Sequence, residues 1–218
     1  MRNIPVITKN LLIINVLVFV ATYALRGLNI DLDTLFGLHF ILASDFRAWQ
    51  FVTYMFMHGG VTHLLMNMFM LWMFGMVVEN VWGPKKFLFY YMVCGLGAGV
   101  CQELAQYGTY VVEGLAQYET VRIANSIIPM SEYLNMMNTV GASGAIYGVL
   151  LAFGMLFPEE RMFIIPIPIP IKAKWIVMGS IVVELFSAIG TSNDGVAHLA
   201  HLGGMLFGFI LIRYWKKH

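Results

Sequence analysis

Three groups of polar residues in this sequence could do chemistry, and the first is a serine flanked by glycines. The run Gly141-Ala-Ser143-Gly144 opens an apolar segment that we expect to be helical. A serine at a helix N-terminus is a candidate nucleophile, because the free backbone N–H groups there can stabilise a developing negative charge. The glycines would let a substrate backbone approach closely. The same residues also fit plain helix packing, since Gly144 and Gly148 form a GxxxG pair.

The second group is centred on His201, in the last apolar segment. His201 lies one turn before Gly204, and Gly204 and Gly208 form a second GxxxG pair. Two helices with such pairs can pack backbone to backbone, which would bring Ser143 and His201 within hydrogen-bonding reach. Histidine can then act as the general base for serine. His198, three residues earlier, is an alternative base, and a lone membrane histidine is more often a packing or gating residue.

The third group is His63 and Asn67, at the start of an earlier apolar segment. The two residues are four apart, so they share one face of a helix. Both side chains can donate hydrogen bonds, which suits an oxyanion hole beside the backbone N–H of Ser143. The alternative is structural, with Asn67 holding two helices together.

The composition decides what kind of protein must position these groups. The chain has 218 residues, of which 59% are hydrophobic and 11% charged. Soluble domains carry roughly 25% charged residues, so a soluble globule is excluded and a membrane protein is indicated. The formal net charge of +1 leaves no basic footprint for nucleic acid. Two cysteines make no disulfide scaffold and lack metal-ligand spacing, and we expect no metal ion and no cofactor.

Six apolar segments are predicted to span the membrane, since a transmembrane helix needs about 20 mostly apolar residues. They cover about 10–25, 62–78, 87–105, 141–157, 173–189 and 196–215. We see no internal repeat of the kind found in many secondary transporters, so we expect one domain over residues 1–218. The predicted fold class is all-α, a polytopic bundle of six transmembrane helices.

The basic residues predict the orientation of this bundle. With a cytoplasmic N-terminus, ten lysines and arginines fall in inside segments and three fall outside. Positive residues favour the cytoplasmic side, so both termini are expected there. The inside set is Arg2, Lys9, Lys85, Lys86, Arg161, Lys172, Lys174, Arg213, Lys216 and Lys217, and the outside set is Arg26, Arg47 and Arg122.

Two long outside loops and one inside connector complete the organisation. Residues 26–61 are too apolar for a free loop, so we expect a partly membrane-embedded, helical loop with Trp49 as an interfacial anchor. Residues 106–138 are more polar and are expected to be an aqueous or interfacial insertion. The alternating prolines of 165–170 cannot form a helix, so this run is predicted to be an extended connector.

In this order along the chain, the motifs resemble those of the rhomboid family of intramembrane serine proteases. The resemblance extends from Trp49 to the end of the sixth predicted span. It rests on Trp49-Gln-Phe-Val-Thr53, on His58 with His63 and Asn67, on Gly75 with Glu79, on Gly141-Ala-Ser-Gly144 with Tyr147, and on Ala200-His-Leu-Gly-Gly204.

The resemblance implies a role for each site residue. Ser143 would be the nucleophile and His201 the base of a Ser-His dyad. His63, Asn67 and the backbone amide of Ser143 would stabilise the oxyanion. Tyr147, one turn after Ser143, would stack against His201 and hold its ring.

Three further residues, His58, Gly141 and Gly144, would support this site. The sequence departs from the family pattern where the family has a tryptophan–arginine pair, because here Gln50 follows Trp49. The 106–138 insertion is also longer than in the compact bacterial members.

Several acidic and sulfur-containing residues are not explained by the resemblance. Glu184 lies midway along the fifth predicted span, and the sequence does not assign its partner. Asp194 could complete a triad, although a position before the sixth helix suggests that it lies in solvent. Cys94 and Cys101, seven apart, are expected to pack.

The implied function is an intramembrane serine endopeptidase that cleaves in or near transmembrane helices of protein substrates. The site would open to the outer face of a bacterial cytoplasmic membrane. The partners would be the substrates and the lipid bilayer, with no nucleic acid. The alternatives are a non-catalytic rhomboid-like protein that binds membrane clients, and a small-solute channel or transporter. The oligomeric state and the physiological substrate stay open.

Overall fold

The computed structural model describes residues 3–164, 167–189 and 196–217, and this part of the chain is mainly helical. The all-α class is confirmed. The helices are α1 (Val6–Arg26), α2 (Leu32–Phe36), α3 (Gln50–Thr53), η1 (Tyr54–Phe56), α4 (Val61–Met70), η2 (Leu71–Gly75), α5 (Met76–Trp82), α6 (Pro84–Val112), η3 (Leu115–Gln117), α7 (Met130–Met136), α8 (Ser143–Leu156), α9 (Ala173–Ile189) and α10 (His198–Lys217). The short strands are β1 (Leu38–His39), β2 (Thr120–Ile123), β3 (Ser126–Pro129), β4 (Asn138–Thr139), β5 (Arg161–Ile164) and β6 (Ile167–Lys172).

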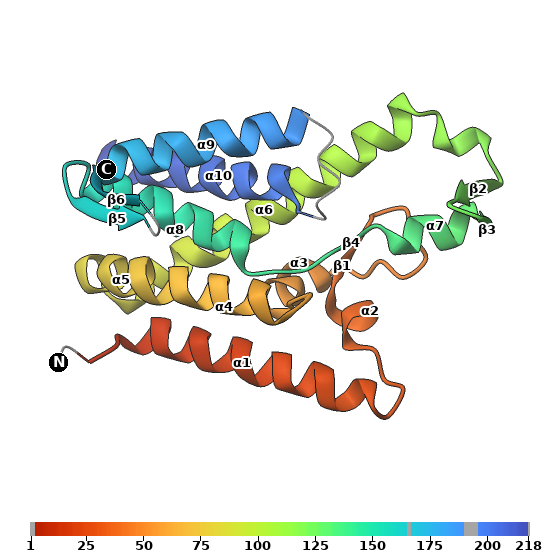
Figure 1. Ribbon diagram of the computed structural model, residues 1–218, viewed down its shortest axis with the longest axis horizontal. Coiled ribbons are helices and arrows are strands. Elements are labelled where there is room, and N and C mark those ends of the chain that lie inside the picture. Colours follow the sequence, from red (N-terminus) through yellow and green to blue (C-terminus); the bar gives the residue numbers. More distant parts are fainter. Residues whose placement is uncertain (1–2, 165–166, 190–195, 218) are drawn as a thin grey trace.

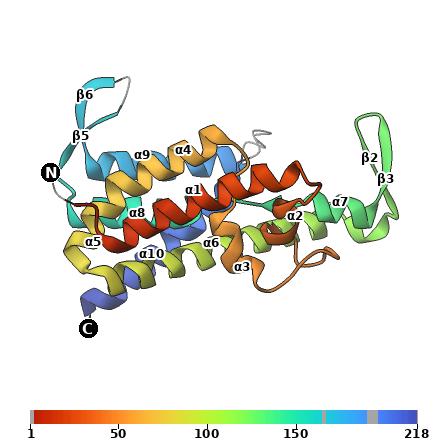
Figure 2. The same cartoon turned by 90° about the horizontal axis from the view of Figure 1, so that it is seen from below.

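Each of the six predicted spans coincides with a long helical segment. These are α1, the continuous run α4–η2–α5, and then α6, α8, α9 and α10, which alternate in direction across the bundle (Figure 1). The start of α1 and the end of α10 lie at the same end of the molecule (Figures 1 and 2). Within the described residues, Val6–Arg26, Val61–Trp82 and Pro84–Val112 are long and apolar enough to cross a membrane. The chain is therefore built as a polytopic helical bundle.

Helix α8 lies at the centre of this bundle, between α6, α9, α10 and the α4–α5 run. Almost all of its side chains between Gly144 and Gly154 are buried. A helix that is apolar all round belongs in a core, and α8 is such a helix. Its backbone is also tied to α6, because the hydroxyl of Tyr90 donates a 2.8 Å hydrogen bond to the carbonyl oxygen of Gly148.

The N-terminus of α1 is held by a buried carboxylate from α5. Glu79 is only 2% exposed and accepts hydrogen bonds from the backbone N–H groups of Ile7, at 2.9 Å, and Thr8, at 2.7 Å. The hydroxyl of Thr8 donates a third bond to it, also at 2.7 Å. A carboxylate stabilises the free N–H groups and the positive dipole end of a helix, so Glu79 fixes α1 against the rest of the bundle.

Helix α6 is longer than its sequence pattern predicts. The span was expected to end near residue 105, but the helix continues to Val112, so the first part of the expected 106–138 loop is helical. No proline interrupts the segment. The helix ends just before Gly114, whose φ of +62° is left-handed and suits a glycine after a helix end.

The rest of the insertion folds back on the loop that follows α1. Strands β1 and β4 pair, and a small cluster of Phe40, Ala43 and Leu134 is buried between the two segments. The two ring nitrogens of His39 each lie 2.9 Å from a carbonyl oxygen, Nδ1 from that of Asn135 and Nε2 from that of Thr34. The β2–β3 hairpin extends beyond this contact at the far end of the molecule (Figure 2).

The proline-rich connector forms a hairpin at the opposite end. Residues 167–172 form strand β6, which pairs with β5 and leads into α9. The expectation of an extended conformation is confirmed for this part of the run, while residues 165–166 lie outside the described residues. The hairpin lies at the same end as the turn between α5 and α6 and the end of α10 (Figure 1).

Candidate active site

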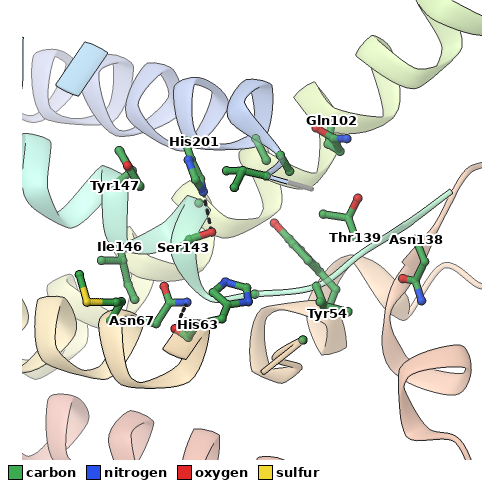
Figure 3. A pocket seen from close by; sticks show the side chains of 18 of the residues that line it. Tyr54, His63, Asn67, Gln102, Asn138, Thr139, Ser143, Ile146, Tyr147 and His201 are labelled. Atoms are coloured by element: carbon green, nitrogen blue, oxygen red, sulfur yellow. Dashed lines mark hydrogen bonds between the residues drawn. The ribbon is translucent and has the colours of Figure 1, made fainter. Parts of the chain in front are cut away.

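Ser143 and His201 are in direct contact at the centre of the bundle. Ser143 is the first residue of α8, and His201 lies in the first turn of α10. The Nε2 atom of His201 is 2.8 Å from Oγ of Ser143, as the dashed line in Figure 3 marks. His201 is buried and Ser143 is half-buried. Of the two candidate bases in α10, it is His201 that meets the serine.

Glycines make this contact possible. A Cβ on Gly204 would lie 1.9 Å from the carbonyl oxygen of Gly144, and a Cβ on Gly148 would lie 3.1 Å from the carbonyl oxygen of Gly204. The backbones of α8 and α10 therefore touch where the two GxxxG pairs face each other. This close approach brings Ser143 on one helix within reach of His201 on the other.

The ring of His201 is covered by Tyr147. The two rings are stacked, with 4.2 Å between their centroids and an interplanar angle of 9°. Tyr147 follows Ser143 by one turn of α8, so the same helix carries the serine and the ring that restricts rotation of its partner.

His63 and Asn67 lie on α4, below Ser143 in the view of Figure 3. A Cβ on Gly141 would lie 2.8 Å from Cε1 of His63 and 3.5 Å from Oγ of Ser143, so the three residues surround one small space. Gly141 has a φ of +133°, which a residue with a side chain rarely adopts. The Nδ2 atom of Asn67 donates a 3.0 Å hydrogen bond to the carbonyl oxygen of His63, which leaves its second amide hydrogen for another acceptor.

His58 lies behind His63 and not at the cavity surface. It is 2% exposed, and its ring meets that of His63 edge-on, with 5.1 Å between the centroids. It precedes α4, outside the membrane-spanning segments. Burial, with a smaller contribution from His63, lowers the pKa of His58 to about 4, so the ring is neutral at pH 7.

The candidate residues line one cavity of about 810 Å³. Ser143, His201, His63, Asn67 and Tyr147 all contribute to its wall. The cavity continues past the serine towards the insertion, where its wall is formed by Gln102, Gln106, Met136, Met137, Asn138 and Thr139. Figure 3 shows Gln102, Thr139 and Asn138 on this side. The cavity thus collects these polar side chains inside a largely apolar bundle.

The contacts of Glu184 could not be predicted from the sequence. The side chain of Glu184, on α9, lies 2.7 Å from Nδ1 of His198 and 3.0 Å from Nδ1 of His201. Glu184, whose partner the sequence did not assign, therefore contacts the candidate base His201. Asp194, which the sequence offered as the third member of a triad, lies outside the described residues.

Gln50, which stands where the family has an arginine, organises the first loop. It is 1% exposed, and its Oε1 atom accepts from the backbone N–H groups of His39, at 3.3 Å, and Arg47, at 3.0 Å. Its Nε2 atom donates to the carbonyl oxygen of Asp45 at 3.0 Å. No local sequence pattern predicts that Gln50 would bond to backbone groups of this loop.

Comparison with known proteins agrees with this architecture. A model of the Rhomboid domain matches residues 45–217. The chain is 28% identical over 166 residues to rhomboid protease AarA of Providencia stuartii, an alignment that covers 75% of this chain and 54% of that protein. It is 28% identical over 215 residues to the putative rhomboid protease YdcA of Bacillus subtilis (strain 168), covering 97% of this chain and 91% of that protein.

A mitochondrial protein shares a similar sequence identity with this chain. The presenilin-associated rhomboid-like protein of Homo sapiens is 30% identical over 167 residues, which cover 74% of this chain and 38% of that protein. The matched region is thus about half of AarA and less than half of the human protein. The Rhomboid domain match extends over most of the present chain, from residue 45 to residue 217. This integral membrane protein therefore belongs to the rhomboid family.

Proposed function

We propose that this chain is a serine endopeptidase that hydrolyses peptide bonds in or near the transmembrane helices of membrane proteins. The observation that carries the proposal is the 2.8 Å contact between Nε2 of His201 and Oγ of Ser143, inside a cavity of about 810 Å³. A serine held against an imidazole is the arrangement that activates a hydroxyl for attack on a carbonyl.

The reaction follows from this geometry in two halves. His201 takes the proton from Ser143 as Oγ bonds to the carbonyl carbon of the substrate, and the C=O electron pair moves to the oxygen. When the tetrahedral intermediate collapses, the C–N bond breaks and the leaving amine takes the proton from His201. Water then attacks the acyl-enzyme as His201 takes its proton. When the second intermediate collapses, the bond between Oγ of Ser143 and the acyl carbon breaks, Oγ takes the proton back from His201, and the acid product leaves.

The oxyanion would be stabilised by groups beneath Ser143. The backbone N–H of Ser143 is at the start of α8, where helical N–H groups have no partner within the helix. The ring of His63 and the second amide hydrogen of Asn67 would add side-chain donors, and Gly141 keeps the space between them clear.

The length of α8 supports a reaction within the membrane. Its 14 residues extend for roughly 21 Å at 1.5 Å per residue, whereas the hydrocarbon core is about 30 Å thick. If Leu156 lies at one face of the core, Ser143 lies roughly 9 Å below the other face. The cavity, which continues from Ser143 towards the insertion at that end, would supply the water for hydrolysis.

We propose that the second face is the outer one. The α5–α6 turn, the β5–β6 hairpin and the end of α10 share the opposite end of the bundle and carry most of the lysines, such as Lys85, Lys172 and Lys216. Positive residues favour the cytoplasm, so both termini would be cytoplasmic in a bacterial cytoplasmic membrane. The partners would be membrane-protein substrates and the surrounding lipid, with no nucleic acid, cofactor or metal ion, and the oligomeric state stays open.

A reconstituted cleavage assay tests the proposal. The purified chain in proteoliposomes is mixed with a reporter protein that has one transmembrane helix, and products are mapped by mass spectrometry. We expect cleavage by the wild type, none by Ser143→Ala or His201→Ala, and labelling of Ser143 by a fluorophosphonate. An inactive, unlabelled wild type that still binds the reporter would support the alternative, a protein that binds membrane clients without catalysis.

A further inference from the structure

Glu184 is an ionisable residue in an unusual place. Helix α9 lies at the edge of the bundle, and within its described length the buried side chains are Ala173, Val177 and Glu184. The first two are near the start of α9, so Glu184 anchors its second half. A carboxylate inside a membrane bundle is costly unless it is paired, and such residues are usually functional.

The carboxylate bridges two histidines of α10, one of which faces Ser143. Its Oε2 atom is 2.7 Å from Nδ1 of His198, and its Oε1 atom is 3.0 Å from Nδ1 of His201. The opposite nitrogen of His201 is the one that contacts Ser143, at 2.8 Å. Ser143, His201 and Glu184 thus form a continuous line across α8, α10 and α9.

We propose that Glu184 is a positioning residue, which holds His201 in the tautomer and orientation that the reaction needs. The inference rests on the proposed function, because it concerns the base of that reaction. It keeps the Ser-His pair expected from the family resemblance and adds to it a glutamate contributed by α9, at the edge of the bundle.

The carboxylate acts on His201 in two ways. A negative charge next to Nδ1 favours the tautomer that has its proton there, which leaves Nε2 free to accept the proton of Ser143. When His201 becomes an imidazolium, the same charge stabilises it. Glu184 stays ionised throughout, and protons move only between Ser143, His201, the leaving amine and the attacking water.

The contact between Glu184 and His201 is close but bent. Nδ1 of His201 has no partner that satisfies hydrogen-bond geometry among the described residues, although the oxygen is 3.0 Å away. Catalytic hydrogen bonds are often poorly aligned without substrate and tighten when it binds. His198 holds the other carboxylate oxygen, so the group can turn towards His201 only slightly and stays in place.

Five side chains in the described part of the chain face His201. They are Ser143 and Tyr147 from α8, Glu184 from α9, His198 from α10 and His63 from α4. Among these described residues Glu184 is the acidic one, so removing its charge should have a specific electrostatic effect on the base.

The same three side chains could also hold a divalent metal ion, because Glu184, His198 and His201 each offer a ligand atom within 4.8 Å of the others. The positioning role is favoured, because the carboxylate oxygens are already within 3.0 Å of both ring nitrogens. A metal ion on Nδ1 of His201 would need these contacts to be replaced.

The first test is Glu184→Gln, which keeps the size of the side chain and removes its charge. We expect kcat to fall by at least about tenfold with little change in KM, because ground-state binding is untouched. The acidic limb of the pH–rate profile should move to lower pH, since the protonated ring loses its counter-charge. Ser180→Ala is the matched control, because Ser180 lies one turn away on α9 and, among the described residues, its hydroxyl donates to the carbonyl oxygen of Val177. It should leave kcat and the profile unchanged.

A double-mutant cycle tests the part of His198. If His198 acts through Glu184, His198→Ala lowers kcat in the wild type but has no further effect in the Glu184→Gln background. Equal losses in both backgrounds would show that His198 acts independently and would overturn this part of the proposal.

A measurement on the wild type covers the case in which Glu184→Gln does not fold. In ¹⁵N-histidine-labelled protein, the Nδ1 proton of His201 should give a strongly deshielded signal, which is absent in His201→Ala and shifted in Glu184→Asp. A signal that Glu184→Asp does not move would overturn the proposal, as would wild-type kinetics in folded Glu184→Gln. Loss of activity on treatment with EDTA and its return with Zn²⁺ would identify a metal site instead. If the wild type cleaves nothing and is not labelled at Ser143, the proposed function itself is contradicted. That result differs from those above, in which the wild type is active and only the role of Glu184 fails.

Discussion

The carbonyl oxygen of Gly144 lies where a side chain on Gly204 would have to start. A Cβ at position 204 would be 1.9 Å from that oxygen, far closer than two such atoms can approach. Because that oxygen belongs to the backbone, no side-chain rotation relieves the clash, and α8 and α10 would have to separate. The contact between Ser143 and His201 depends on this backbone contact.

The first prediction therefore concerns Gly204→Ala. Displacement of α10 should move His201 away from Ser143, and a shift of about 1 Å can cost roughly a hundredfold in rate. We expect a loss of that order in kcat/KM, measured on the reporter substrate, with a lower Tm in detergent. Gly179→Ala on α9 is the control, because a Cβ there meets nothing within 4 Å. Wild-type turnover by Gly204→Ala would show that the glycine contact does not position the pair.

The second prediction concerns Gly141, which leaves space between His63 and Ser143. In Gly141→Ala the new methyl group would lie 2.8 Å from Cε1 of His63, on a backbone whose φ is +133°. We expect kcat to fall by at least about tenfold, since the loss of one oxyanion donor typically costs about a hundredfold or more. Gly59→Ala is the matched control, because Gly59 also lines the cavity and its Cβ would meet only Val140, at 3.9 Å. Equal activity of the two variants would contradict the role given to Gly141.

The third prediction separates the ring of Tyr147 from its hydroxyl. Tyr147→Phe preserves the stacked ring, which lies 4.2 Å from that of His201, whereas Tyr147→Ala removes it. Aromatic stacking contributes roughly 0.5–1.5 kcal/mol, so we expect Ala to lower kcat by about three- to tenfold and Phe to change it by less than about twofold. Steady-state kinetics of both variants provide the test. If Phe loses as much as Ala, the hydroxyl and not the stacking orients the base.

The fourth prediction concerns the pH dependence of stability. The pKa of His58 is about 4 in the folded protein, below the value of 6.5 for an unperturbed histidine, because the ring is buried. The unfolded chain then binds the extra proton first, so the contribution of neutral His58 is complete above pH 6.5 and is lost as the pH falls from 6.5 to 4. The loss amounts to roughly 3 kcal/mol. Thermal unfolding in detergent should show a Tm that falls over this range in the wild type and falls less in His58→Phe. Parallel curves for the two proteins would contradict the assignment.

Much of the architecture could be predicted because it depends on local sequence. A run of apolar residues long enough to cross a bilayer has few alternatives to a helix, so the six spans followed from composition and breakers. The glycine pairs predicted close contact between α8 and α10, because only residues without a side chain permit it. The end of α6 was predicted seven residues too early, but its true position also depends on local sequence, since the helix continues almost to Gly114.

The contacts of Glu184, Gln50 and His58 were decided by the tertiary structure alone. Glu184 meets His198 and His201 across two helices, and nothing within α9 indicates which neighbour a carboxylate there will face. Gln50 is satisfied by backbone groups of a loop whose path depends on the whole bundle. The sequence determined which residues could do chemistry and which segments cross the membrane, because residue type and hydropathy are properties of the chain itself. Which polar groups meet inside the bundle depends on how the helices are rotated and packed against one another, and only the folded structure determines that.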